Sequence, residues 1–447
     1  MTSDDPRLGR ISRGTYTVFE DRAAASGRTL DLAVVVLHAR AAEPAPDPIF
    51  YLAGGPGQDA TTLVDAWIDA SLREERDVVL VSQRGTGGSL RLDCAYGDES
   101  DLQSYLGPMF PADVFRACLA DLAQRADLTQ YSTCSAMDDL DQVRSALGYA
   151  KIDLYGGSYG TRAALVYLRQ HPETVRCAIL EGVAPIAFTN PLYHAREAQT
   201  ALELVFDECD GTPACHEAIP DPRGDLASVL ARLAAEPATV SVSHPDTGER
   251  VAVRLTRADF AEGLRVLLYY LPNSRRVPWL VHRAAAGDLE PFASAAIASN
   301  RALRSLVAYG MLLCVTCAED VARIDPDSIA SATDGTFLGS DRVRQQMAVC
   351  AFWPKSELPD GFDEPVRADV PTLVLSGTID PVTSPRWGAE AARHLPRALH
   401  VVAPGAHGLD DPCIDSMRQA FLDAPDVEAL DTGCVGAMRL PPFELGD

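Results

Sequence analysis

Residues 152–162 read Ile152-Asp153-Leu154-Tyr155-Gly156-Gly157-Ser158-Tyr159-Gly160-Thr161-Arg162. The first four form a short apolar run typical of a buried strand, and residues 159–170 have the pattern of a helix. The five residues between fit G-x-S-x-G, which is typical of a serine on a sharp turn between strand and helix. Small neighbours let such a turn close while the hydroxyl stays exposed at the positive end of the helix. We therefore predict that Ser158 is a nucleophile.

Further apolar runs, rich in β-branched residues, flank this stretch. They predict buried strands at 31–38, 49–53, 77–82, 151–155, 176–181, 371–376 and 398–403. Helical patterns lie between the later strands, at 137–147, 159–170, 385–394 and 414–422. Strand and helix alternate as a mostly parallel, doubly wound sheet requires, so we predict an α/β fold.

The alternation is interrupted after residue 185. Helical patterns near 193–208, 224–235, 257–271 and 300–314, with a hairpin across 239–255, occupy about 180 residues before strand rhythm resumes at Pro371. An insertion at this point of the chain would lie over the carboxyl ends of the strands. We therefore expect a sheet domain formed by 1–185 and 367–447, and a mainly helical cap domain at 186–366.

A serine hydroxyl is a weak nucleophile, so it needs a histidine base, and the base needs an acid on its other nitrogen. In chain order the acid and then the histidine follow the serine, on loops after later strands. Asp380 and His407 stand in such loops, and we predict that they complete a triad with Ser158. Glu181 is the main rival acid, and Asp410 and Asp411 are weaker ones.

Acyl transfer also requires backbone N–H groups that face the developing oxyanion. The amide after the nucleophile, that of Tyr159, is one expected donor. The glycine-rich loop Ala53-Gly54-Gly55-Pro56-Gly57 follows an early strand, and Gly55 is the expected second donor, with Gly54 as the alternative.

Four motifs together resemble the proline iminopeptidase and tripeptidyl-aminopeptidase family of α/β-hydrolase serine peptidases. These motifs are Ala53-Gly54-Gly55-Pro56-Gly57, Gln83-Arg84-Gly85-Thr86-Gly87-Gly88-Ser89, Asp138-Asp139-Leu140-Asp141-Gln142-Val143-Arg144 and Gly156-Gly157-Ser158-Tyr159-Gly160-Thr161-Arg162. Asp380-Pro381-Val382-Thr383, Gly405-Ala406-His407-Gly408 and Cys413 resemble the tripeptidyl-aminopeptidase branch. The resemblance covers roughly 30–190 and 365–440, and it implies the α/β-hydrolase fold.

The resemblance further implies an exopeptidase that cleaves peptides from a free N-terminus and holds their ammonium with acidic groups. The candidates for that role are Glu181, Glu203, Glu208, Asp259 and Glu262. An alternative with the same triad is an esterase, amidase or cyclase acting on a small metabolite, because fold does not fix substrate. An acidic group near an amine-sized site would favour the peptidase over this alternative.

The chain has eleven cysteines, and sequence position together with the resemblance suggests three disulfides. These are Cys413 with Cys434, Cys209 with Cys215 and Cys317 with Cys350. Cys314 and Cys317 have C-x-x-C spacing, but no second cysteine pair or histidine couple lies nearby, so we expect no zinc.

Composition narrows the class of partner. A formal net charge of −24 opposes binding to phosphate backbones or anionic lipid, so neither nucleic acid nor a membrane is an expected partner. No apolar run is long enough to span a bilayer, no signal pattern opens the chain, and no dinucleotide or phosphate-loop motif predicts a cofactor. The expected protein is cytoplasmic as written, or secreted or periplasmic if a signal once preceded it. The oligomeric state is left open.

Overall fold

The computed structural model describes residues 1–68, 70–94 and 96–446, and within them one large sheet contains nine strands. The strands are β1 (Thr2–Asp5), β2 (Gly9–Phe19), β3 (Thr29–Leu37), β4 (Ile49–Leu52), β5 (Val78–Val81), β8 (Ile152–Gly157), β9 (Val175–Glu181), β12 (Thr372–Gly377) and β13 (Ala398–Ala403). Their order is β1-β2-β3-β5-β4-β8-β9-β12-β13. Pairing is antiparallel from β1 through β3 to β5 and parallel from β5 to β13. The predicted mostly parallel sheet is confirmed, and β1 and β2 extend it beyond the predicted strands.

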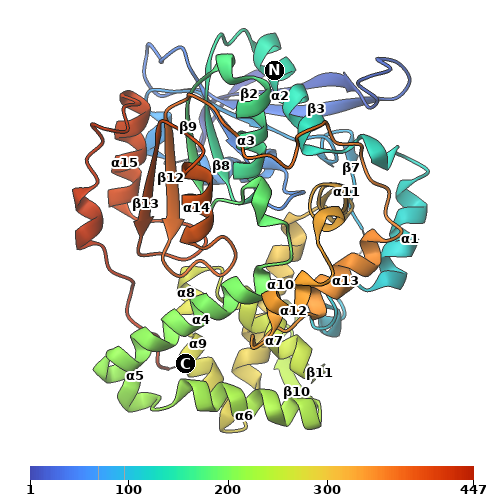
Figure 1. Cartoon of the computed structure of the whole chain (residues 1–447), viewed down its shortest axis with the longest axis vertical. Helices are drawn as coiled ribbons and strands as arrows, with labels where there is room; N and C mark the ends of the chain where they lie inside the picture. Colours follow the sequence, from blue (N-terminus) through green and yellow to red (C-terminus); the bar gives the residue numbers. More distant parts are fainter. Residues whose placement is uncertain (69, 95, 447) are drawn as a thin grey trace.

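Helices cover both faces of the sheet (Figure 1). One apolar cluster joins alternate strand residues such as Val79 and Leu154 to α2 (Thr133–Leu147) and α3 (Tyr159–Gln170). A second joins the intervening residues, such as Leu80 and Leu375, to α15 (Pro412–Asp423). Residues that alternate along a strand face opposite sides of a sheet, so both faces of the central strands are buried, as their continuous apolar runs predict.

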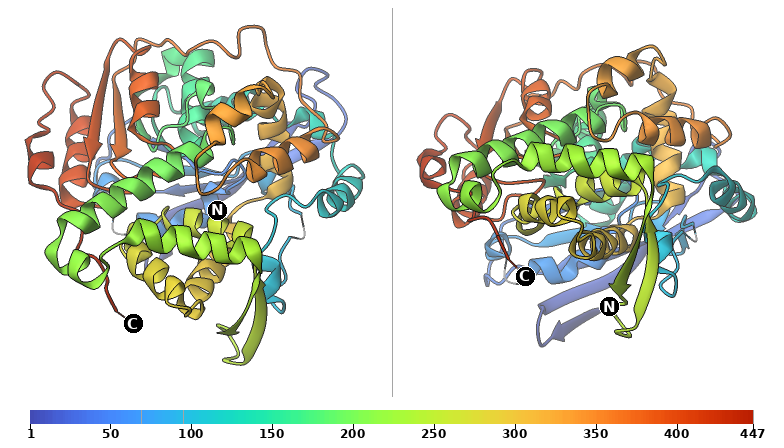
Figure 2. Two further views of the ribbon diagram at one scale, coloured as in Figure 1. Left: turned by 60° about the horizontal axis from the view of Figure 1, so that its bottom comes forward. Right: turned by 90° about the horizontal axis from the view of Figure 1, so that it is seen from below.

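The chain between β9 and β12 is mainly helical. It contains α4 (His194–Gly211), α5 (Pro213–Ala218), α6 (Pro222–Ala235), β10 (Ala238–Ser243), β11 (Arg250–Leu255), α7 (Arg257–Leu267), α8 (Leu271–Ser274), α9 (Val277–Ala285), α10 (Glu290–Leu306), α11 (Tyr309–Glu319), α12 (Ser328–Thr333) and α13 (Asp341–Cys350). Helices α4 to α10 lie at the lower end of the molecule in Figure 1, and Figure 2 shows them from below. They enclose most of another apolar cluster, which also contains Ile379 and Ala406 from the loops after β12 and β13. In this cluster Phe260 and Phe292 stack with ring centroids 3.8 Å apart.

Helix α11 differs from the helices before it, because its buried residues belong to the cluster under the sheet. The inserted chain thus packs partly on itself and partly on the core. The predicted domain bounds at 185 and 366 stay a prediction.

Two predicted helices have different bounds. The helix expected over 300–314 is divided between α10 and α11, because Val307 bridges to Gln58 and the Ala308 N–H donates to the Gly57 carbonyl at 2.9 Å. The helix expected over 257–271 ends at Leu267, because the backbone becomes extended at Tyr270 before a separate short helix, α8, begins at Leu271. The hairpin expected across 239–255 is present as β10 and β11.

Four disulfides join eight of the cysteines. The three predicted pairs, Cys209–Cys215, Cys317–Cys350 and Cys413–Cys434, are present, and Cys94–Cys118 was not predicted. Cys134, Cys177 and Cys314 carry free thiols, so the C-x-x-C spacing of Cys314 and Cys317 does not mark a pair.

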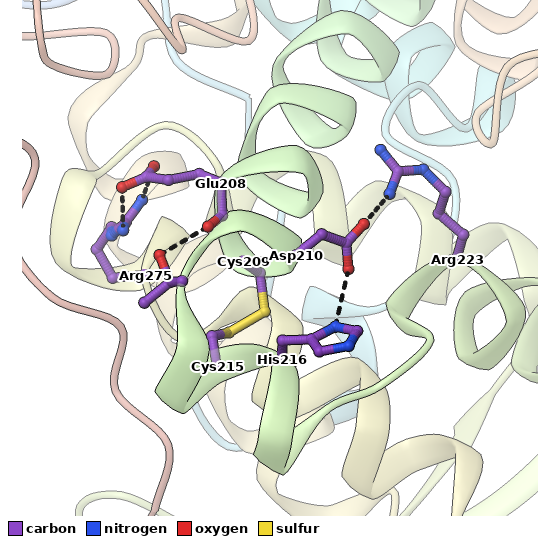
Figure 3. Close-up of a disulfide and its surroundings, with 8 residues drawn as sticks. Glu208, Cys209, Asp210, Cys215, His216, Arg223 and Arg275 are labelled. Carbon is purple, nitrogen blue, oxygen red and sulfur yellow. Dashed lines mark hydrogen bonds and ion pairs between the residues drawn. A yellow bond between two sulfur atoms is a disulfide. The ribbon is translucent and has the colours of Figure 1, made fainter.

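The Cys209–Cys215 disulfide fastens the end of α4 to α5 (Figure 3). Residues beside it reach two further elements: Asp210 pairs with Arg223 of α6 at 2.8 Å, and Glu208 pairs with Arg275 at 2.7 Å. This corner of the inserted region is therefore held by covalent and ionic links.

Within the residues described, none of the helices combines the length and apolar character that a bilayer span requires. The same residues contain no group of three or more histidine, cysteine, aspartate or glutamate side chains arranged to hold a metal ion.

Candidate active site

Ser158 lies in the turn between β8 and α3, where its backbone has φ 56° and ψ −124°. This left-handed φ is costly for a side chain and is typical of residues whose position is fixed by the surrounding fold. The flanking glycines make the turn possible: a Cβ on Gly160 would lie 1.9 Å from the Leu52 carbonyl oxygen, and one on Gly156 would lie 2.4 Å from the Gly160 oxygen. The G-x-S-x-G pattern therefore reflects tight packing of α3 against β4 and β8.

The structure brings together the three residues predicted to form a triad. His407 Nε2 is 2.9 Å from Ser158 Oγ, and His407 Nδ1 is 3.0 and 2.9 Å from the two carboxylate oxygens of Asp380. Asp380 follows β12 and His407 follows β13, so both loops end at the same edge of the sheet as Ser158. This arrangement lets a histidine take a proton from a serine hydroxyl while the carboxylate orients the ring.

Asp380 is buried, and its carboxylate is held as an anion by hydrogen bonds. The backbone N–H groups of Val382 and Thr383 donate to Oδ1 at 2.8 and 2.9 Å, and the Thr383 hydroxyl donates to Oδ2 at 2.8 Å. Burial alone would raise the pKa of Asp380, but the charge of His407 and these hydrogen bonds hold the pKa below its ordinary value. Burial likewise acts to lower the pKa of His407, and the charge of Asp380 outweighs it, so this pKa is raised.

Glu181, the rival acid, occupies a different position. Its Oε2 accepts from Tyr155 Oη at 2.7 Å and Arg418 Nη2 at 2.5 Å, and its Oε1 accepts from the Leu409 N–H at 2.8 Å. Glu181 thus anchors the loop that carries His407, and it is not among the described residues that line the cavity at Ser158. The hypothesis that it binds substrate finds no support in these contacts and remains untested. Asp411, a weaker rival acid, caps α15.

The two predicted oxyanion donors border the same cavity as Ser158 and His407. Tyr159 is the first residue of α3, and the first N–H groups of a helix have no acceptor within it. The Gly54 N–H donates to Gln58 Oε1 at 3.2 Å, whereas no acceptor for the Gly55 N–H lies among the described residues. This difference favours Gly55 over Gly54 as the second donor.

The cavity at Ser158 has a volume of about 200 Å³. Much of its wall is apolar and comes from outside the sheet, including Met109, Phe188, Leu306, Val307 and Leu312. Tyr269, which follows α7, lies edge-on to the His407 ring with centroids 5.3 Å apart. Side chains of the inserted region therefore restrict access to the nucleophile.

Asp320 is the one carboxylate among the described residues that line this cavity, and it is fully paired. Both of its oxygens accept from Arg162 Nη1, at 2.7 and 2.8 Å. The acids proposed from the sequence to hold an ammonium are also engaged elsewhere. Glu203 pairs with Arg223, Glu208 with Arg275 and Glu262 with Arg265, while Asp259 caps α7.

Basic and neutral polar groups also line the cavity, and the sequence analysis did not single them out. They are Arg265 of α7, Arg342 of α13, His194 of α4 and Asn190 before it. Their positions depend on how separate helices pack, and no local motif marks them.

One motif of the family resemblance has a structural role. Arg84, in the loop after β5, donates to both carboxylate oxygens of Asp139 on α2, at 2.7 and 3.0 Å. Both residues are buried. This pair fastens the loop after β5 to the helix that precedes the nucleophile strand.

The fold, the turn that carries Ser158 and the triad geometry are those of an α/β-hydrolase. Comparison with known families gives the same class. Residues 47–409 match the family model of the alpha/beta hydrolase fold, so the chain belongs to this family. The predicted fold is thereby confirmed.

Among curated proteins, the chain is similar to serine protease Hip1 of Mycobacterium tuberculosis, with 26% identity over 329 residues, which is 66% of this chain and 60% of the relative. It is also similar to proline iminopeptidase of Neisseria meningitidis, with 25% identity over 136 residues, 30% of this chain and 32% of the relative. The chain thus spans 60% of the length of the first relative and 32% of the length of the second. Among solved structures, a proline iminopeptidase of Mycobacterium smegmatis has a TM-score of 0.40 at 16% identity and covers 93% of this chain and 100% of its own.

Proposed function

We propose that this hydrolase acts through an acyl-enzyme on Ser158 and cleaves peptide bonds from the free N-terminus of peptides. The observation that carries the catalytic part is the hydrogen-bonded series from Ser158 Oγ through His407 to Asp380. The peptidase part rests on the similarity to a serine protease and to proline iminopeptidases.

In this proposal His407 removes the proton of Ser158 as its Oγ attacks the substrate carbonyl. The oxyanion is stabilised by the N–H groups of Gly55 and Tyr159. His407 then gives the proton to the leaving amine, the amine departs, and a water activated by the same histidine hydrolyses the acyl-enzyme. The chemistry requires no group beyond these residues and water.

A specific observation favours a second candidate, an esterase, amidase or cyclase acting on a small acyl substrate. The acids expected to hold a peptide ammonium all have partners, and the one carboxylate on the described cavity wall is paired with Arg162. One neutral acceptor on this wall is Asn190 Oδ1, which is buried and has no partner among the described residues. A neutral oxygen holds an ammonium less strongly than a carboxylate does.

A panel of chromogenic substrates separates the two candidates. Proline, alanine and Ala-Ala-Pro p-nitroanilides with free amines are compared with their N-acetylated forms and with p-nitrophenyl butyrate. Cleavage of the free-amine anilides, with little cleavage of the acetylated ones, supports the aminopeptidase. Cleavage of the ester alone, with no preference for a free amine, contradicts it and supports the small-substrate hydrolase.

A further inference from the structure

The residues that line the cavity at Ser158 carry more positive than negative charge. Arg265 and Arg342 both line the cavity, and both interact with Glu262. Two guanidinium groups thus share one carboxylate, which leaves one positive charge uncompensated. This inference rests on the catalytic site proposed above and concerns what that site accepts.

The two arginines differ in how fully they are engaged. Arg265 Nε donates to both oxygens of Glu262, at 3.0 and 3.1 Å, and its Nη1 donates to Tyr269 Oη at 2.6 Å. Arg342 Nη1 contacts Met109 Sδ, a weak acceptor, and lies 3.5 Å from Glu262 Oε1, while its buried Nε has no acceptor among the described residues. Arg342 is therefore the group whose charge is available to a ligand.

His194 is a second, independent sign of a missing partner. Its side chain lines the cavity, is only 4% exposed and stacks on Phe188 with centroids 5.6 Å apart. Neither ring nitrogen has a hydrogen-bond partner among the described residues. A buried imidazole without partners is unfavourable, because its desolvated N–H and its lone pair both go unpaired.

Arg342 also borders a second cavity that contains carboxylates, and these do not pair with it. Arg342 and Met109 also line an adjoining cavity of about 440 Å³, whose wall includes Asp259 and Asp341. Within the described part of the chain, neither of these carboxylates forms an ion pair with Arg342. Glu262 is thus the acid that faces both arginines.

We propose that Arg342, with Arg265 and His194, forms a subsite for a carboxylate on the acyl part of the substrate. A guanidinium with free donors matches a carboxylate in charge and geometry, and an enclosed apolar surround strengthens the attraction. The cavity volume of about 200 Å³ suits a short acyl part. The substrate class is therefore a short acid-bearing acyl compound, which includes a peptide with an N-terminal glutamate as well as a half-ester of a dicarboxylic acid.

Matched substrate pairs test this subsite. Glutamate p-nitroanilide is compared with glutamine p-nitroanilide, and p-nitrophenyl hemiglutarate with p-nitrophenyl pentanoate. Each pair keeps its leaving group and changes mainly the carboxylate. We expect the wild-type protein to favour the acidic member of at least one pair by about tenfold to a hundredfold in kcat/KM, the usual range for a charge-assisted hydrogen bond.

Three variants assign the preference to Arg342. Arg342→Met should remove the preference, Arg342→Lys should retain part of it, and Arg223→Met, a surface arginine on α6, should retain all of it. Preference for the neutral members in the wild-type protein, or a preference that Arg342→Met leaves intact, would overturn the proposal while the hydrolase function stands.

If no member of either pair is cleaved, the substrate panel described above decides the proposed function, and calorimetry with glutarate decides the subsite separately. Binding of glutarate, but not glutaramide, to the wild-type protein and to Ser158→Ala, with loss in Arg342→Met, supports it. Absence of glutarate binding to the wild-type protein overturns it.

Discussion

The predicted catalytic residues and the two arginines of the proposed subsite line the same cavity but come from different parts of the chain. Each predicted catalytic residue lies in a turn or loop just after a strand of the parallel sheet, whereas Arg265 and Arg342 lie on helices α7 and α13 of the inserted region. Strand ends of a parallel sheet meet at one edge, so local sequence fixes where a loop residue will lie. A helix residue reaches the cavity only through the packing of distant helices. Local sequence thus places the predicted triad, whereas long-range contacts place the arginines of the proposed subsite.

The largest effect expected from the strand-end residues is that of Ser158→Ala. Removing Oγ should reduce kcat by about 10⁴ to 10⁶ on any substrate that is cleaved, because no acyl-enzyme can form. Steady-state kinetics and labelling by a fluorophosphonate probe measure this loss, and circular dichroism checks the fold. Retention of more than about a hundredth of the wild-type turnover would mean that another residue is the nucleophile.

A comparison of Asp380→Asn with Glu181→Gln tests the choice of acid. The Asp380 carboxylate accepts a hydrogen bond from His407 Nδ1. The amide of Asp380→Asn should favour the wrong tautomer of the imidazole and lower kcat by about 10⁴-fold. Glu181→Gln keeps an acceptor for the Leu409 N–H and weakens the pair with Arg418, so it should lower kcat much less. If the Glu181 variant loses more activity than the Asp380 variant, the acid is misassigned.

The contrast between the two regions explains what the sequence could predict. The strand runs, the glycine-flanked serine and the two late loops lie within short segments, and the structure brings Ser158, Asp380 and His407 to hydrogen-bond distance. The division between α10 and α11 was missed because it depends on Gly57 and Gln58, which are about 250 residues away in the chain.

The partners of the acids in the inserted region could not be predicted for a related reason. Glu262 was considered as an ammonium ligand, but its charge is taken up by Arg265, three residues further along α7. The i, i+3 spacing of Glu262 and Arg265 allows such an ion pair on a helix. The sequence alone does not show which face of the helix turns toward the cavity, so it does not show whether the acid is paired there. The Cys94–Cys118 disulfide was missed because neither position in the sequence nor the family resemblance pointed to it.

The separate apolar cluster of the inserted region predicts a large stability effect at Phe260. This side chain is fully buried and stacks on Phe292, so Phe260→Ala should lower the free energy of unfolding by about 3–5 kcal/mol. Urea denaturation followed by circular dichroism measures the change. Phe19→Ala, at an exposed position on β2, is the control and should have little effect. A loss below about 1 kcal/mol at Phe260 would argue against a well-packed core in this region.

The pKa of His407 predicts the pH dependence of the reaction. The ring must be neutral to act as a base, and Asp380 raises its pKa above the ordinary value of about 6.5. We therefore expect kcat/KM to fall about tenfold for each pH unit below a midpoint that lies above 6.5. In Asp380→Asn the residual activity should have a lower midpoint, because the charge that favours the imidazolium is gone. A midpoint unchanged by this substitution would contradict the proposed coupling.

The smallest predicted effect concerns the tail that links the two regions. Phe443 packs against the cluster of the inserted helices, and the Arg275 guanidinium lies 3.6 Å from its ring centroid. The Glu444 N–H donates to the Arg275 carbonyl at 3.2 Å, which fixes the tail beside this ring. Phe443→Ala should lower the free energy of unfolding by about 1–2 kcal/mol, because it removes a partly buried ring and a cation–π contact but leaves the backbone bond. Urea denaturation of Phe443→Ala, Phe260→Ala and the double variant shows whether the tail stabilises the same core. Non-additive losses of unfolding free energy would mean that the two residues interact through one core, and additive losses would mean that they act independently.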